Sequence, residues 1–231
     1  MLRGGVLAAL LATSASAEGI TTARYTDPTP RYDHGILGDA IEWGALEMTS
    51  DQGRRLRVTL PDTRVFEDTE PRVVDLDGDG AAEVITVETD LAKGARLVIY
   101  GPKGLIAATP HIGATHRWLA PIGAADLDGD GFTELAYVDR PHLAKTIRVW
   151  RFRNAALTHV ADLPGFTNHR IGEDNIAGGI RTCTGPPEMI VADANWSQIH
   201  AVTYTNGRFQ ARALGPHQNR ASFAAAMACK P

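Results

Sequence analysis

An acidic nine-residue segment occurs twice in this chain. Residues 75–83 have the sequence DLDGDGAAE, and residues 126–134, which lie 51 positions later, have the sequence DLDGDGFTE. In both copies carboxylates stand at positions 1, 3, 5 and 9, and glycines at positions 4 and 6 allow a sharp turn. Carboxylates held so close repel one another unless a cation lies between them. The repeat therefore predicts two cation-binding loops; the alternative is an acidic turn without an ion.

Calcium is the cation that suits this spacing best, because it takes six to eight oxygen ligands at about 2.3–2.6 Å and tolerates irregular geometry. We expect the residue at position 7 to contribute its backbone carbonyl. An EF-hand is excluded, because position 12 carries no acid and both segments continue into strand-like runs. The predicted calcium ligands are Asp75, Asp77, Asp79, Ala81 and Glu83 in the first loop, and Asp126, Asp128, Asp130, Phe132 and Glu134 in the second.

Both segments resemble the calcium loop of FG-GAP/VCBS repeats, which form the blades of integrin-alpha-type β-propellers, here of the exported bacterial type. In that family the loop joins the innermost strand of a blade to the next strand, and the resemblance implies the same position here. The family's ligands correspond to the four acids of each segment. Glutamate at position 9, where aspartate is commoner, departs from the family pattern but still reaches the ion. The resemblance covers most of residues 33–229 and is strong only around the two loops.

A longer repeat surrounds these loops. Four glutamates, spaced 41, 51 and 54 residues apart, each begin a similar segment: Glu42, Glu83, Glu134 and Glu188. Periods of this size with strand-forming residues inside them indicate propeller blades. No window shows a sustained helical period, so we predict an all-β fold. The predicted strands, rich in β-branched and aromatic residues, are 83–88, 96–100, 134–139, 146–152, 188–193 and 198–204.

The first and last repeats lack the acids. In the first repeat, residues 33–39 occupy the loop position without carboxylates at positions 1, 3 and 5. In the last repeat, Arg181 stands where the first aspartate should be, and Cys183 follows it. We therefore predict no metal at that loop. Either the fixed cation of Arg181 replaces the ion, or Cys183 tethers the loop.

The segment 222–229 is small and apolar, and we predict that it forms a last inner strand. A lone strand would leave its backbone groups unpaired, so this one should complete the N-terminal blade. The predicted fold is thus a small propeller of four blades, or five if residues 20–36 contribute one, closed by the C-terminal strand. The two cysteines of the chain, Cys183 and Cys229, are predicted to form a disulfide at the closure. Two buried free thiols are the alternative.

The N-terminus predicts export. Residues 1–17 combine Arg3, a short apolar run and the small residues ASA, which is typical of a cleaved signal peptide. An uncleaved anchor is the alternative. We expect a single domain over residues 18–231, located in the periplasm or secreted, without a membrane span. The net charge is −4, and eight of the 27 acids belong to the two loops, so we expect no nucleic-acid partner.

The usual catalytic motifs are missing: the sequence contains no nucleophile elbow, zinc helix, P-loop or dinucleotide fingerprint. The recurring pairs His116–Arg117 and His169–Arg170 precede inner strands. We expect them to hydrogen-bond the connections between blades, with anion binding as the alternative. The other histidines have no ligand spacing: His34, His111, His142, His159, His200 and His217.

The sequence favours a non-enzymatic, calcium-binding exported propeller, in which the calcium is structural and the loops of one face bind a protein or a glycan. One alternative is a polysaccharide-acting hydrolase or lyase with its site in the propeller channel. Acidic and aromatic side chains at one mouth of the channel, separate from the calcium loops, would indicate it. A purely structural subunit of a periplasmic assembly is the other alternative, since a fold does not fix a function.

Overall fold

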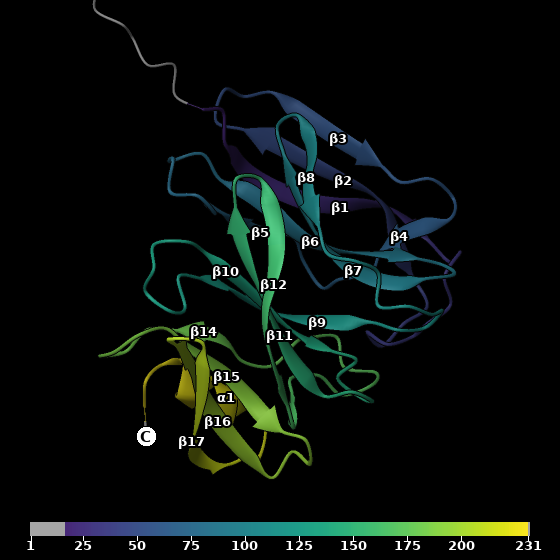
Figure 1. Cartoon of the computed structure of the whole chain (residues 1–231). Coiled ribbons are helices and arrows are strands. Elements are labelled where there is room, and N and C mark those ends of the chain that lie inside the picture. The colour runs from purple at the N-terminus through teal and green to yellow at the C-terminus, as the bar shows by residue number, and fades with distance from the viewer. Residues whose placement is uncertain (1–16, 231) are drawn as a thin grey trace, which may run out of the picture.

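A computed structural model describes residues 17–230; residues 1–16 of the predicted signal peptide lie outside the described residues. The described chain forms seventeen strands and one short helix, arranged in three antiparallel sheets (Figure 1). The all-β prediction is therefore confirmed, apart from one helix that the sequence analysis missed. Within residues 17–230 no helix reaches the length and apolarity that crossing a membrane requires.

The first sheet contains eight strands. Its order is β1-β2-β4-β6-β7-β8, with β3 paired to β2 and β5 paired to β6. A single residue pair, Trp43 opposite Phe66, joins β2 to β4. This pair connects the N-terminal strands of the first sheet to its C-terminal strands. The strands are β1 (Ile20–Thr29), β2 (Glu42–Ser50), β3 (Arg55–Thr59), β4 (Arg64–Phe66), β5 (Arg72–Val74), β6 (Glu83–Asp90), β7 (Gly94–Gly101) and β8 (Gly104–Ala108).

The second and third sheets follow in chain order. The second runs β12-β11-β10-β9, and the third runs β13-β15-β16-β17 with β14 also paired to β15. Their strands are β9 (Leu119–Ala125), β10 (Glu134–Asp139), β11 (Thr146–Arg153), β12 (Ala156–Pro164), β13 (Phe166–Thr167), β14 (Gly179–Arg181), β15 (Glu188–Asp193), β16 (Gln198–Thr205) and β17 (Arg208–Pro216).

One plan recurs in the three sheets: an inner strand, two middle strands and an outer strand. The inner strand is continuous as β9, but it is divided into β4 and β5 in the first sheet and into β13 and β14 in the third. All six predicted strands are present, within two residues at each end. The four marker glutamates are the first residues of the strands β2, β6, β10 and β15, so the predicted register of the repeat is confirmed.

The core lies between neighbouring sheets. Every residue of β10 is buried, and so is every residue of β6 except Asp90. These strands are covered on both faces, which explains why apolar and β-branched residues occur on both sides of each strand. Leu97 of the first sheet packs in one cluster with Leu119 and Tyr137 of the second. A second cluster joins Val149 of the second sheet to Val191 of the third.

The predicted closing strand is wrong, because residues 220–227 form the helix α1 (Arg220–Met227). Asn219 caps this helix, and Asn219 and Ser222 form a reciprocal capping box. Alanine has the highest helix propensity, so the alanine-rich run between these signals folds as a helix. No sheet closes on itself among the described strands, and the number of blades stays a prediction. Residues 20–29 form the edge strand β1 of the first sheet.

The Cys183–Cys229 disulfide is confirmed, with a Cα–Cα distance of 5.9 Å. It joins the loop after β14 to the residue that follows the C-cap of α1. The bond therefore fixes the helix to the third sheet, where Phe223 and Ala226 pack against Ile190 and Ala201. It does not close a ring between the first and last repeats.

Candidate functional site

The two acidic segments occupy the same place in successive sheets. The first connects β5 to β6 and the second connects β9 to β10, as the resemblance implied. The hydrogen bonds from the two glycines to the first aspartate also correspond. Asp75 accepts from the backbone N–H groups of Gly78 and Gly80 at 2.8 and 3.0 Å, and Asp126 accepts from those of Gly129 and Gly131 at the same distances. Each loop therefore holds its first carboxylate in place with its own backbone.

The glutamate at position 9 of each loop is turned back over the segment. Glu83 accepts a hydrogen bond from the N–H of Leu76 at 3.0 Å, and Glu134 accepts one from Leu127 at 2.9 Å. Both glutamates are buried. The local sequence thus sets the position of the ninth residue as well as the first.

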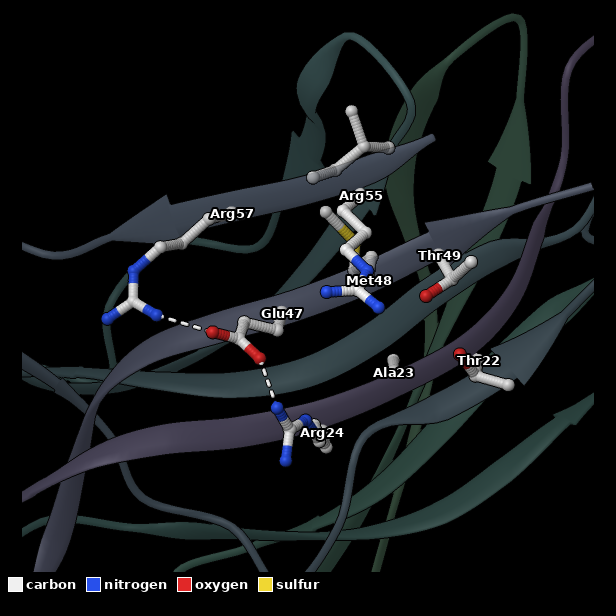
Figure 2. Close-up of a pocket in the computed structure, with 9 residues that line it drawn as sticks. Thr22, Ala23, Arg24, Glu47, Met48, Thr49, Arg55 and Arg57 are labelled. Atoms are coloured by element: carbon white, nitrogen blue, oxygen red, sulfur yellow. Dashed lines mark hydrogen bonds and ion pairs between the residues drawn. The ribbon is translucent and has the colours of Figure 1, made fainter. Parts of the chain in front are cut away.

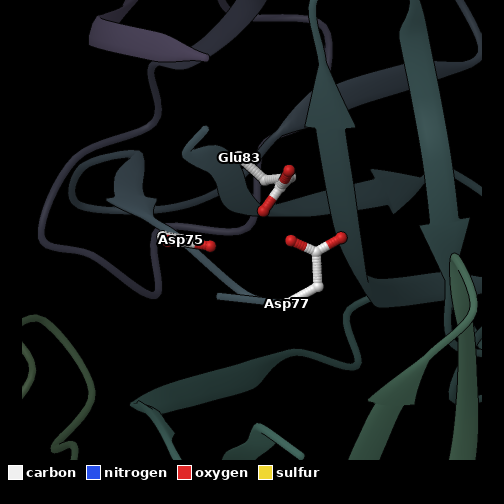
Figure 3. Close-up of side chains that lie close together, drawn as sticks. All are labelled: Asp75, Asp77 and Glu83. Carbon is white, nitrogen blue, oxygen red and sulfur yellow. The ribbon is translucent and has the colours of Figure 1, made fainter. Parts of the chain in front are cut away.

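Three of the four predicted carboxylates in each loop come together. Asp75, Asp77 and Glu83 each offer an oxygen within 4.8 Å of the other two, and Figure 3 shows these side chains gathered in one place. Asp126, Asp128 and Glu134 form the corresponding group in the second loop. The acids at position 5 lie outside these groups. Asp79 accepts from Ala81 N–H at 2.8 Å and Asp130 accepts from Phe132 N–H at 2.9 Å. These bonds shape the turn.

The first loop carries its negative charge without a neighbouring cation. No arginine, lysine or histidine forms an ion pair with its acids among residues 17–230. Burial raises the pKa of Glu83 to about 7, and the negative charges of Asp77 and Asp79 add to the rise. This loop therefore offers a cation three converging carboxylates.

The second loop differs because Arg151 reaches it from β11. Its guanidinium lies 2.6 Å from Glu134 Oε1, 2.5 Å from Asp128 Oδ2 and 3.0 Å from Asp130 Oδ2. Arg151 stands opposite Glu134 in the strand pairing. In the first sheet the corresponding residue is Gly101, because its neighbour Tyr100 pairs with Val84. The sequence analysis missed this residue, although its place opposite the marker glutamate could have indicated it.

Both loops fit a hard divalent cation. Their donors are carboxylate oxygens, the ligands that calcium prefers. In the second loop Oδ1 of Asp128 is buried and has no hydrogen-bond partner, which is costly unless a cation or water satisfies it. The carbonyls of Ala81 and Phe132, together with Asp79 and Asp130, stay predicted ligands.

The loop of the last repeat uses both of the substitutes predicted for a metal. Arg181 donates to Glu188 Oε2 from Nε at 2.8 Å and also donates to the carbonyl of Ala226 at the end of α1. Arg212 pairs with the other oxygen of Glu188 at 2.7 Å. Cys183, two residues after Arg181, forms the disulfide. Here a guanidinium and a covalent bond replace the acids of the other loops.

Histidines that are far apart in the sequence meet at the opposite ends of the middle strands, against our expectation. The His34 and His116 rings stack with their centroids 4.9 Å apart. His142 Nε2 lies 3.2 Å from His169 Nδ1, and His169 Nε2 donates to the carbonyl of Glu173 at 2.9 Å. His169 thus hydrogen-bonds a connection, as predicted, but the connection joins the two halves of one inner strand.

A shallow groove of about 480 Å³ crosses the face of β1, β2 and β3. Glu47 lies between two arginines there, with Arg24 at 2.5 Å and Arg57 at 2.6 Å (Figure 2). Arg55, which also lines the groove, forms no ion pair within the described part of the chain. The groove therefore presents more positive than negative charge.

The fold and the loops together define a class: an all-β protein of successive antiparallel sheets with acidic loops between inner and middle strands. Residues 75–137 match the FG-GAP-like repeat family. The matched segment begins at the first aspartate of the first loop and ends in β10, so both acidic loops lie within it. The chain thus carries FG-GAP-like repeat sequence, which is consistent with an FG-GAP repeat protein. No curated protein matches the chain.

Proposed function

We propose that this protein is an exported, calcium-stabilised β-propeller module that binds a protein or glycan partner. The single observation that carries the calcium part is the convergence of three carboxylates in each of two loops with the same hydrogen bonds. The FG-GAP-like repeat match over both loops supports the module class. The disulfide is typical of oxidising compartments and supports a periplasmic or secreted location.

The calcium in this proposal is structural. Each loop joins an inner strand to a middle strand buried between sheets, so an ion there fixes how the inner strand meets the core. Extracellular modules bind calcium with a Kd of about 10⁻⁴–10⁻³ M. At tenfold saturation one such site adds about 1.4 kcal/mol to the free energy of unfolding.

Calorimetric titration of the protein with calcium tests the proposal. We expect two sites in the wild type and one site in either Asp77→Ala or Asp128→Ala. EGTA should lower the melting temperature without unfolding the protein at room temperature, and Asp77→Ala should lose about half of that shift. Asp51→Ala is the matched control, because Asp51 is exposed and lies outside both loops.

If the calorimetric titration with calcium gives no heat of binding and EGTA leaves the melting temperature unchanged, the calcium sites are rejected. The partner is tested separately, on a glycan array and by pull-down from the native envelope, each with calcium and with EGTA. If the calcium-loaded protein retains no glycan and no protein, the binding part of the proposal fails while the metal part stands.

A further inference from the structure

A pocket of about 290 Å³ lies at the far ends of the middle strands from the acidic loops. Strand β10 runs from Glu134, at the second acidic loop, to Asp139, beside the pocket residue Arg140. Six residues of extended strand separate the two ends by about 17 Å. The pocket is therefore independent of the metal loops.

Behind the lining of the pocket, the partly buried His34 pairs with the fully buried Glu67. Nδ1 of His34 shares a hydrogen bond with Oε1 of Glu67, and Thr89 donates to the other carboxyl oxygen at 2.6 Å. Glu67 is fully buried, and its backbone carbonyl accepts from the indole N–H of Trp118 at 2.8 Å. Within residues 17–230 no protein group hydrogen-bonds Nε2 of His34. The ring is thus fixed through Nδ1, while Nε2 is left for a ligand.

The imidazole of His34 and the carboxyl group of Glu67 are both neutral near pH 7. Burial lowers the pKa of His34 to about 4, and the positive charge of Arg117 adds to the decrease. Burial also raises the pKa of Glu67 to about 8. At neutral pH the pair therefore adds no net charge to the pocket.

The charge of the pocket comes from Arg117. The other arginine in the wall, Arg140, forms a two-point ion pair with Asp139 at 2.8 and 3.0 Å. Arg117 has no carboxylate partner in the described chain, and its guanidinium donates only to the carbonyl of His116 at 3.2 Å. No acidic residue lines the pocket. An anion entering it would meet an unpaired guanidinium.

The rim of the pocket is apolar. Leu143 and Ile171 are 63% and 70% exposed there. Ile36 and Pro141 continue the apolar wall further in. A ligand of this pocket therefore gains from an apolar body as well as from a charge.

The backbone around the pocket is strained and held in place. His116 and Arg140 have φ of +56° and +44°, in the left-handed region that residues other than glycine seldom adopt. Tyr32 accepts the N–H of His116 at 2.7 Å and fixes the first of them.

We propose that this pocket binds a small organic anion with an apolar body, whose charged group pairs with Arg117 and hydrogen-bonds Nε2 of His34. The size of the pocket suits ligands of about ten heavy atoms, such as an aromatic carboxylate. The rim holds the body of the ligand, and the exposed His116 ring stacks on His34 beside it. The binding of this anion does not depend on the calcium loops or on the protein or glycan partner.

Calorimetric titration of the calcium-loaded protein with phenylacetate, benzoate and hexanoate tests this proposal. We expect Kd values on the order of 0.1–1 mM for ligands of this size. Benzamide, the neutral analogue of benzoate, should bind at least tenfold more weakly. In NMR spectra the indole N–H signal of Trp118 should shift on binding. Galacturonate binding as tightly as phenylacetate, or none of the carboxylates binding, would overturn the proposal.

Variants of the pocket residues test where the anion binds. Arg117→Gln should weaken phenylacetate binding about tenfold or more, whereas Arg208→Gln, an exposed arginine without an ion pair on β17, should not change it. His34→Asn keeps a polar atom beside Glu67, removes Nε2 and should weaken binding several-fold.

A substitution at the exposed rim tests the site without disturbing the fold, because the side chain of Leu143 is 63% exposed. Leu143→Asp puts a negative charge on the exposed rim and should abolish binding, and Leu105→Asp is its control because Leu105 is 55% exposed and lies outside the pocket. If Leu143→Asp binds as the wild type does, the ligand is not in this pocket.

Discussion

Arg151 makes the two acidic loops unequal at the level of single residues. The backbone of both loops holds the first and ninth acids in the same way. Only the second loop has a guanidinium against three of its acids. A calcium ion there must share the carboxylates with Arg151 or displace it, whereas the first loop offers its carboxylates without competition. We therefore expect the first loop to bind calcium more tightly.

Replacing Arg151 tests this difference. Arg151→Gln should raise the calcium affinity of the second loop on the order of tenfold, because unit charges 4 Å apart interact by about 1–4 kcal/mol near a protein surface. Without calcium the same variant should be less stable than the wild type, since its carboxylates then lie together uncompensated. Calorimetry in the Asp77→Ala background isolates the second loop. An affinity that falls instead would mean that Arg151 shapes the loop for the ion.

These residues also show what a sequence reveals at this scale. The acids and glycines of each loop act within nine residues, so their spacing predicted the loop, and the resemblance to FG-GAP/VCBS repeats implied its place between strands. Arg151 lies 17 residues from Glu134 and meets it only through strand pairing. The acids at position 5 stay predicted ligands, and Asp79 and Asp130 also accept hydrogen bonds from the backbone two residues later. These hydrogen bonds are local, yet the spacing of the acids does not reveal them.

Among the elements, α1 is the one that the sequence pattern assigned to the wrong class. Its residues are small and apolar like those of the inner strands, and the repeat register favoured a strand. The capping box of Asn219 and Ser222 decides the outcome, because it satisfies N–H groups that a strand would leave unpaired at the end of a sheet. Arg181 then donates to the carbonyl of Ala226, where a positive charge is favourable at a helix C-terminus.

The disulfide is predicted to hold this helix on the third sheet. The bond closes a loop with a sequence separation of 46 residues, for which chain entropy predicts a stabilisation of about 2–4 kcal/mol. In the double variant Cys183→Ser, Cys229→Ser we expect a lower melting temperature and faster amide hydrogen exchange in α1 than in β10. Reduced wild-type protein should behave as the variant does. Unchanged protection of α1 amides would show that packing of Phe223 and Arg181 holds the helix without the bond.

The divided inner strands are the second element-level feature that the pattern did not reveal. The sequence shows that a strand precedes each loop, and β5, β9 and β14 are in the expected places. It does not show that β4 and β13 pair with the other ends of the same middle strands. These pairings are long-range, so the spacing of residues along the chain does not reveal them. The residues between β13 and β14 include His169, which lies beside His142, and Ile171, which lines the pocket.

At the scale of the whole molecule, the middle strands separate two kinds of chemistry. Their N-terminal ends carry the acidic loops, and the C-terminal end of β10 faces the pocket. The loops were predictable because each is one continuous segment. The pocket was not, because its walls come from the segments before β2, before β9, after β10 and after β13. Scattered histidines in a repeat protein therefore carry little meaning until the sheets are assembled.

Buried carboxyl groups make the stability of the whole chain depend on pH. Burial raises the pKa of Glu42 to about 9, and the neighbouring carboxyl groups of Glu67 and Asp39 add to the rise. The unfolded chain has the ordinary glutamate pKa of about 4.5, so the folded state binds the extra proton between these two values. The stabilisation is complete below pH 4.5 and is lost as the pH rises towards 9.

Glu42→Gln replaces the neutral carboxyl group by a neutral amide of the same shape, which does not ionise. We expect the variant and the wild type to have similar melting temperatures near pH 4.5. The variant should then become more stable than the wild type by several degrees as the pH rises to 9, because only the wild type must keep its buried carboxyl protonated or pay for a buried charge. Taking the difference between the two proteins at each pH cancels the other titrating groups. Glu70→Gln, at an exposed glutamate, should show no such trend; a difference between Glu42→Gln and wild type that is constant from pH 4.5 to 9 would mean that Glu42 is ionised in the folded protein.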